Sequence, residues 1–216
     1  MTAMTAAAVV IPFPQKRQRR ARNSMTFLTP DEILRVLRVA KERSARDHAM
    51  ILLGYRHGMR ASEVCGLKLR EVDLKNLQIE VNRLKNSLRT VQPLDAHKGD
   101  NRSVFDEIVV LKRWLAERVE DGSGYVFLSQ KGGALSRKQF YATFRAIALA
   151  AGIAPEKAHP HTLKHSRATN LIAAKVGLME VKALLGHKSI SSTVQYIGVS
   201  DQQAAEAAKR ADAEMF

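Results

Sequence analysis

Apolar residues recur along this chain at the three- and four-residue spacing of helices, then for one short stretch at every second position. The segment TPDEILRVLRVAKER begins with Thr29, Pro30 and a capping-box Glu32, and it predicts an amphipathic helix. The apolar face of that helix comprises Ile33, Val36, Leu37 and Ala40. A second apolar run, Ala45–His57, ends at Gly58 and predicts a second helix.

The alternating stretch predicts a β-hairpin. LQIEVNR alternates apolar and polar residues, KNS is suited to a tight turn, and LRTVQPL supplies the returning strand. YVFLSQ, from Tyr125, predicts another short strand.

Helical patterns resume on both sides of that strand, and Ser136 is placed to cap one of them. The further predicted helical segments are Ser62–Leu67, Phe105–Glu117, Ser136–Gly152, His161–Val176, Leu178–Leu185, Ile190–Ile197 and Asp201–Glu214. The expected fold class is therefore α+β, mainly helical with a small antiparallel sheet. We expect a tail over residues 1–25, one domain over 26–200 and a C-terminal helical segment over 201–216.

Charge indicates the kind of partner. The chain has 35 Lys and Arg against 21 Asp and Glu, a net charge of +14, which favours a polyanion. An apolar run of about 18 residues, the length that spans a bilayer, does not occur, so nucleic acid is expected rather than a membrane. The single cysteine, Cys65, permits no intrachain disulfide and fits the cytoplasm.

The tail concentrates positive charge before the ordered domain. Its basic residues are Lys16, Arg17, Arg19, Arg20 and Arg22. Two interpretations are open: a solvated end, or an arm that binds DNA phosphates.

Four stretches carry basic or titratable residues that a helical core does not need. They are HGMRASEVCGL with Arg60, VNRLKNSLR with Lys85, HPHTLKHSRAT with His161, Lys164 and His165, and LLGHKSISSTVQY with His187 and Tyr196. Each has a simple structural explanation when taken alone, since an arginine can interact with a helix end and a tyrosine can pack.

In this order, the four stretches resemble the motifs of the tyrosine recombinase (phage integrase) family over about residues 26–200. The resemblance implies that Tyr196 attacks a DNA phosphodiester and forms a 3′-phosphotyrosyl link. Arg60 and His187 are then expected to stabilise the transition state, His161 to take the tyrosine proton and Lys85 to protonate the leaving 5′-oxygen.

The same resemblance implies a partner and an assembly. The expected partner is double-stranded DNA, bound by a homotetramer on two sites, and no metal or other cofactor is required because side chains supply the positive charge. Arg83 and Arg89 flank the hairpin lysine, and they and Arg167 are candidate DNA-binding residues.

The chain departs from the family pattern at the third motif. Lys164 stands where the family has arginine, and lysine offers a compact ammonium instead of a two-pronged guanidinium. Three interpretations follow: Lys164 serves directly, Arg167 supplies a guanidinium, or the site is degraded and the protein only binds DNA.

Length is the second departure. The sequence has about 25 residues before the catalytic part, which resembles the short recombinases that invert fimbrial switches and lack a separate core-binding domain. Residues 201–216 could dock on a neighbouring protomer, pack on their own domain or fray.

Two enzymatic alternatives use the same residues differently. His161 and His165 have the spacing of a zinc-peptidase motif, but Thr162 replaces the glutamate that such an enzyme needs. A type IB topoisomerase also uses a tyrosine, although the GHxxxxxTxxY spacing ending at Tyr196 favours recombination.

Overall fold

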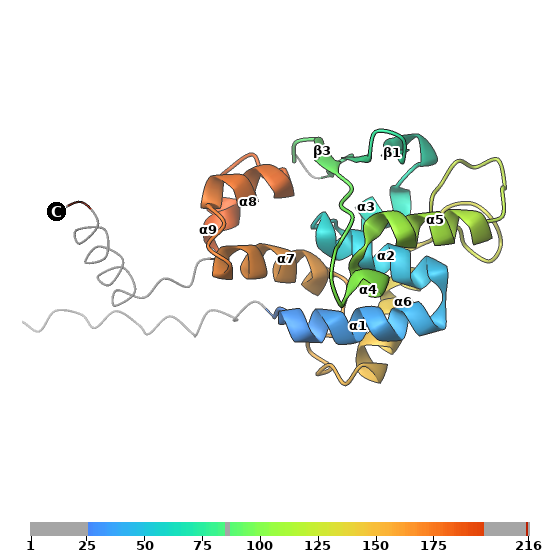
Figure 1. Ribbon diagram of the computed structural model, residues 1–216, viewed down its shortest axis with the longest axis horizontal. Coiled ribbons are helices and arrows are strands. Elements are labelled where there is room, and N and C mark those ends of the chain that lie inside the picture. Colours follow the sequence, from blue (N-terminus) through green and yellow to red (C-terminus); the bar gives the residue numbers. More distant parts are fainter. Residues whose placement is uncertain (1–25, 85–86, 197–214, 216) are drawn as a thin grey trace, which may run out of the picture.

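A computed structural model of the chain describes residues 26–84, 87–196 and 215, and helix α2 (Ala45–Arg56) runs through its centre (Figure 1). Ten of the twelve α2 residues are buried. Three helices pack around it: α1 (Pro30–Arg43), α5 (Glu107–Glu117) and α7 (His161–Ala173). A helix that is buried on nearly all sides is a core helix, which accounts for the unbroken apolar run from Ala49 to Leu53.

Helix α1 begins as predicted. The Thr29 backbone N–H donates to Glu32 at 2.8 Å, and the Thr29 hydroxyl accepts from the Glu32 backbone N–H at 3.3 Å. All four residues of the predicted apolar face are buried.

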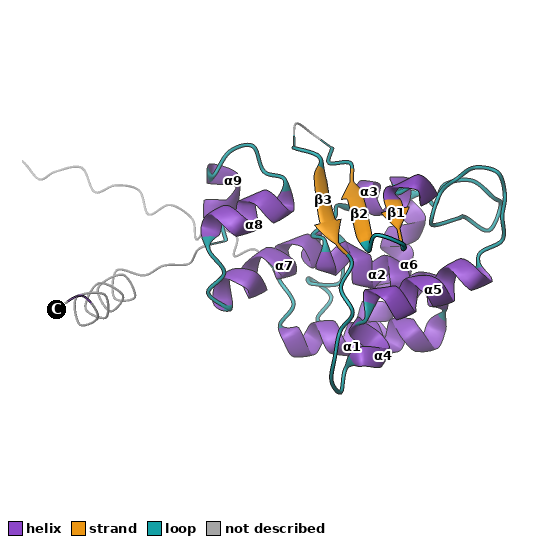
Figure 2. Cartoon of the chain, turned by 45° about the horizontal axis from the view of Figure 1, so that its top comes forward, coloured by secondary structure: helices purple, strands orange, loops and turns teal. Residues whose placement is uncertain are grey.

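The predicted hairpin is confirmed as part of a three-stranded antiparallel sheet. Strands β1 (Val72–Asp73), β2 (Gln78–Val81) and β3 (Thr90–Pro93) lie in the order β1-β2-β3 (Figure 2). The β2–β3 register runs from Gln78 opposite Pro93 to Val81 opposite Thr90. Helix α3 (Ala61–Gly66) and a short 3-10 turn, η1 (Leu69–Glu71), connect α2 to the sheet.

Two predicted elements differ from the structure. Phe105–Glu117 is not one helix, because the Asp106 carboxylate caps α5 by accepting from the Val109 N–H at 3.0 Å, which separates α5 from α4 (Arg102–Phe105). YVFLSQ is not a regular strand: it makes isolated bridges, such as Lys68 to Tyr125, and is held by burial of its apolar residues.

The last described third of the chain is helical, as expected. It contains α6 (Arg137–Ala150), α7, α8 (Leu178–Leu185) and α9 (Ser191–Val194). Helix α7 ends three residues before Val176, since Lys175 adopts a left-handed φ of 63°. The predicted segment Asp201–Glu214 lies outside the described residues.

Apolar residues form two separate clusters within the described part of the chain. The large cluster surrounds α2, whereas the small one joins α7 and α8 around Ala168, Val181, Leu185 and Tyr196. Figure 1 shows α7, α8 and α9 gathered at one end of the molecule. The α+β fold class is confirmed, and none of the described helices is long and apolar enough to cross a membrane.

Candidate active site

Five of the six predicted catalytic residues line one hollow of about 440 Å³ between α3, the hairpin and helices α7 to α9. These residues are Arg60, His161, Lys164, His187 and Tyr196. The sixth, Lys85, lies outside the described residues, but Ser87 from the same hairpin lines the hollow.

Arg60 is fixed by a carboxylate on its own helix. Its side chain donates to Glu63 at 2.7 Å and to the Leu84 carbonyl at 3.1 Å, while its backbone N–H donates to the other Glu63 oxygen at 2.9 Å. Burial raises the pKa of Glu63, but the Arg60 N–H and the Arg83 charge outweigh it, so the net pKa is lowered. Glu63 is therefore an ionised anchor that orients Arg60.

Lys164 reaches the hollow from α7 and is almost fully buried, with 2% exposure. Among the described residues, its ammonium donates one long bond, of 3.4 Å, to the Leu185 carbonyl. Burial, together with the charges of Arg83 and Arg60, lowers the pKa of Lys164 to about 7. The position thus holds a cation that is poorly compensated by the protein itself.

His187 follows a glycine that no other residue can replace without strain. Gly186 has a φ of +65°, and an added Cβ would lie 2.4 Å from the Leu88 carbonyl oxygen. The His187 Nδ1 lies 2.9 Å from the Thr193 hydroxyl. Burial first, and then Lys164 and Arg60, lower the pKa of His187 to about 4, so the imidazole is neutral at pH 7.

Tyr196 belongs to the small apolar cluster and to the hollow. Its ring lies 5.5 Å from the His165 ring and 6.5 Å from the His187 ring, measured between centroids. Burial raises the pKa of Tyr196 against the opposing effects of Gln195 and Arg60. Its hydroxyl is therefore protonated at neutral pH, and a base has to accept its proton before it can attack.

His161 and His165 stack edge to face, with centroids 4.3 Å apart. Burial and the neighbouring His161 lower the pKa of His165 to about 4. His159 is not among the residues that line the hollow, and its Nδ1 lies 3.1 Å from the Thr162 hydroxyl. Within the described ranges, no group of three His, Cys, Asp or Glu side chains is arranged to hold a metal ion.

Two predicted DNA-binding arginines do not reach this hollow. The Arg83 side chain is 0% exposed and bonded to protein oxygens, which contradicts the expectation of a phosphate contact. Arg167 lies over the Tyr55 ring at 5.7 Å and lines a different hollow with Glu107, so it does not substitute for Lys164. Both arginine side chains are held away from the hollow because they contact residues that lie far from them in the sequence.

The other predicted DNA-binding residues fall into two groups. The Arg89 side chain is 62% exposed and paired with Glu80, so its role in DNA binding stays a prediction. Lys16, Arg17, Arg19, Arg20 and Arg22 lie outside the described residues.

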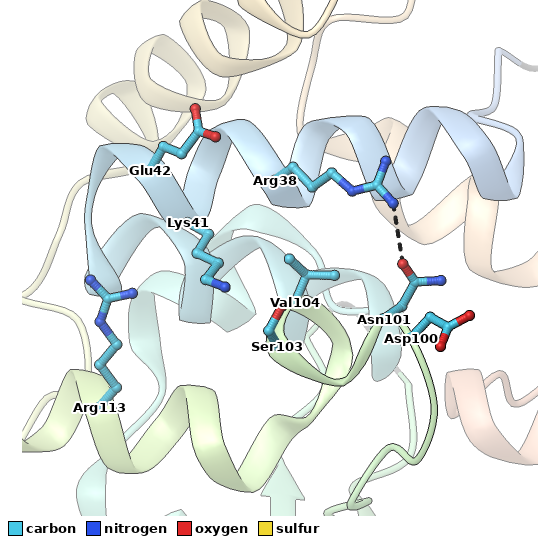
Figure 3. A pocket seen from close by; sticks show the side chains of 8 residues that line it. All are labelled: Arg38, Lys41, Glu42, Asp100, Asn101, Ser103, Val104 and Arg113. Atoms are coloured by element: carbon cyan, nitrogen blue, oxygen red, sulfur yellow. Dashed lines mark hydrogen bonds between the residues drawn. The ribbon is translucent and has the colours of Figure 1, made fainter.

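A second hollow, of about 340 Å³, lies on α1, α4 and α5 (Figure 3). Arg38 there donates to the Asn101 amide oxygen at 3.2 Å. Its lining residues are Arg38, Lys41, Glu42, Asp100, Asn101, Ser103, Val104 and Arg113, and none of the motif residues is among them.

Two supporting residues received no role from the sequence. Glu63 has a recognisable signal, because an acidic residue three positions after Arg60 lies on the same helix face. Thr193 is the threonine of the GHxxxxxTxxY spacing, and the structure places it, fully buried, beside His187.

The chain belongs to the phage integrase family, the site-specific tyrosine recombinases, because the model of that family matches residues 26–203. It is 37% identical over 186 residues to the type 1 fimbriae regulatory protein FimB of Escherichia coli K12, covering 84% of this chain and 86% of FimB. It is 32% identical to the tyrosine recombinase XerC of Lactobacillus delbrueckii, covering 79% of this chain and 56% of XerC.

Solved recombinase structures have the same fold. XerH bound to its difH substrate in a pre-cleavage complex matches with a TM-score of 0.70 at 26% identity, over 88% of this chain and 56% of XerH. XerA matches with a TM-score of 0.71 at 23% identity, over 88% of this chain and 66% of XerA. The chain thus spans between about half and two thirds of these solved proteins.

Proposed function

We propose that this chain cleaves and rejoins DNA at specific sites, with Tyr196 as the nucleophile. The observation that carries the proposal is the convergence of Arg60, His161, Lys164, His187 and Tyr196 on one hollow of about 440 Å³. XerH, which is similar in fold and 26% identical, was solved bound to its DNA substrate, which supports DNA as the ligand.

The reaction exchanges one phosphoester for another. The Tyr196 oxygen forms a bond to phosphorus, the bond from phosphorus to the 5′-oxygen breaks, and the 3′-phosphotyrosyl link keeps the phosphoester. His161 accepts the tyrosine proton, and Lys85 donates a proton to the leaving 5′-oxygen. Rejoining reverses these steps and needs no external energy source.

Positive charge stabilises the transition state. Negative charge grows on the non-bridging oxygens during attack, where fixed donors are most effective. Arg60 presents donors held by Glu63, Lys164 contributes an ammonium and neutral His187 contributes one hydrogen bond. Lys164 acts directly, because Arg167 faces another hollow.

Recombination requires four strand cuts, two at each of two DNA sites. One Tyr196 in each protomer cuts one strand, so we propose a homotetramer on paired sites in the cytoplasm. Residues 201–216 are the proposed segment that docks on a neighbouring protomer, and residues 1–25 the proposed phosphate-binding tail.

A covalent-trapping assay tests the function. Protein is incubated with nicked suicide DNA from its own genomic neighbourhood, and denaturing gels detect the adduct. We expect an adduct with the wild type and none with Tyr196→Phe, which removes only the attacking oxygen. Site-specific DNA binding without an adduct would instead support a binding-only protein, and relaxation of supercoils by monomers without a defined site would support a topoisomerase.

A further inference from the structure

Arg83 is a buried arginine that connects three segments of the candidate active site without lining its hollow. One guanidinium nitrogen donates to the Gly58 carbonyl at 2.9 Å and to Glu63 at 3.2 Å. The other donates to the His57 carbonyl at 2.7 Å and to the Leu184 carbonyl at 2.8 Å. Both terminal nitrogens are thus committed to protein oxygens, so Arg83 cannot also bind a phosphate with them.

Each of these bonds ends close to a proposed catalytic residue. His57 and Gly58 precede Arg60, and Glu63 is the carboxylate that holds the Arg60 guanidinium. Leu184 is the penultimate residue of α8, three positions before His187. One side chain therefore spans the segments that present the two principal donors to the phosphate.

Other contacts also join these segments: Gln92 donates to the Leu184 carbonyl at 2.9 Å and lies 2.9 Å from His57 Nδ1, and the Leu88 N–H donates to the Gly186 carbonyl at 2.8 Å. Arg83 differs from these contacts because it also reaches Glu63, the carboxylate that holds Arg60. The β2–β3 ladder ends at the pair Val81–Thr90, so strand pairing does not extend to Arg83. The large and small apolar clusters are separate, with Leu184 packed against the small one. A planar group with several donors suits such a junction, whereas lysine has one nitrogen and cannot reach all four oxygens at once.

We propose that Arg83 is a positioning residue, which sets Arg60 through Glu63 and His187 through the end of α8 so that both meet the same scissile phosphate. This inference rests on the proposed function, since it assigns Arg83 a role in that reaction. Arg83 acts through other residues and does not touch the reacting atoms.

The test measures single-turnover cleavage by Arg83→Lys on two DNA substrates. The first is ordinary suicide DNA. In the second, a methyl group replaces one non-bridging oxygen of the scissile phosphate, which removes the negative charge that Arg60 and His187 have to stabilise. We expect Arg83→Lys to cut ordinary DNA about 10- to 100-fold more slowly than wild type but the methylated DNA within about threefold of wild type. DNA affinity should change by less than about threefold, because cleavage and binding use different contacts.

Controls separate this inference from the function on which it rests. Arg60→Ala should be rescued by the methylated substrate in the same way, whereas Arg113→Met, which removes an exposed guanidinium on α5, should cut both substrates like wild type. If Arg60→Ala is not rescued, the proposed role of Arg60 fails. If Arg60→Ala is rescued and Arg83→Lys is not, the inference about Arg83 fails alone.

Folding is checked in the same samples by circular dichroism at the assay temperature. Arg83→Lys keeps the positive charge beside Glu63, so the variant should remain folded. A folded Arg83→Lys that cuts ordinary DNA at the wild-type rate would also overturn the inference, because charge without the four bonds would then be sufficient.

Discussion

Lys164 stands where the motif resemblance implies an arginine, and its buried environment makes the effect of that lysine measurable. The side chain is buried among cations, and the pKa of Lys164 is lowered to about 7. Arginine remains charged at any pH at which the protein is folded. The choice of lysine therefore makes transition-state stabilisation sensitive to pH near neutrality.

The first prediction concerns pH dependence. As pH rises through about 7, Lys164 loses its proton and its ability to stabilise the phosphate, so cleavage should slow. Lys164→Arg should retain its rate, and the ratio of variant to wild-type rate should rise about tenfold or more between pH 6 and pH 9. Single-turnover cleavage across that range measures the ratio. Parallel pH profiles would show that Lys164 does not contribute its charge.

A second prediction concerns the stability cost of this lysine. The pKa of Lys164 is about 7 in the folded protein against an ordinary 10.5, so between these values the unfolded chain binds more protons and stability rises with pH. Below pH 7 the full penalty for burying the charge remains. Lys164→Met should therefore raise the free energy of unfolding at pH 6.5 by about 1–4 kcal/mol while abolishing rapid cleavage.

Urea unfolding at pH 6.5 and pH 9 checks this expectation. The gain should be smaller at pH 9, where the folded wild-type protein holds Lys164 mostly neutral. A methionine variant that is less stable than wild type at pH 6.5 would contradict the assigned environment.

Residue identities and their order were sufficient to predict which residues meet in the hollow, but not which arginines stay accessible. Arg60, His161, Lys164, His187 and Tyr196 belong to motifs whose chemistry requires convergence. Arg83 looks like a surface residue of a hairpin in the sequence, and its burial depends on carbonyls of distant residues: those of His57 and Gly58, and that of Leu184, which is 101 residues away along the chain. Such contacts leave no local signal.

At the scale of elements, the hairpin and α8 approach each other closely beside the hollow. The Leu88 N–H donates to the Gly186 carbonyl at 2.8 Å, and the Leu88 carbonyl occupies the space that a Gly186 side chain would need. The glycine of the Gly-His motif is thus explained by packing between two elements as well as by its left-handed φ.

The third prediction follows from that junction. Gly186→Ala should lower the free energy of unfolding by about 1–3 kcal/mol, because both the conformation and the backbone oxygen oppose a Cβ. Gly66→Ala is the matched control: Gly66 ends α3 with open space around it, so alanine there should be neutral or stabilising by up to about 1 kcal/mol. Thermal or urea unfolding of both variants gives the comparison, and equal effects would remove the packing explanation.

Element boundaries show what periodicity can and cannot predict. Helices α1, α2 and α8 follow the pattern closely, since capping residues and glycines mark their ends. The pattern did not predict the helix break at Asp106, because an aspartate inside an apolar pattern is compatible both with a helix interior and with a cap. The pattern did not predict that residues 125–134 make isolated bridges instead of a regular strand. A continuous apolar run without alternation does not distinguish a strand from an irregular buried segment.

At the scale of the whole molecule, charge governs affinity for DNA. The net charge of +14 includes five cations between Lys16 and Arg22. Each phosphate contact releases bound counterions, so the logarithm of the affinity falls with the logarithm of salt concentration by about 0.9 per contact. Salt dependence therefore counts the phosphate contacts that the protein makes.

The fourth prediction uses this count to decide between the two interpretations of the tail. Glutamine at Lys16, Arg17, Arg19, Arg20 and Arg22 removes the charge and keeps chain length. If the tail binds phosphates, the slope of log affinity against log salt should become shallower by about 4 to 5, so the loss of affinity relative to wild type should be largest at low salt and shrink as salt rises. A solvated tail would leave the slope nearly unchanged. Cleavage of prebound suicide DNA should remain at the wild-type rate in either case, since Tyr196 and the residues that line its hollow lie outside residues 1–25. A variant that binds DNA normally but cleaves it slowly would show that the tail contributes to catalysis and not to phosphate binding.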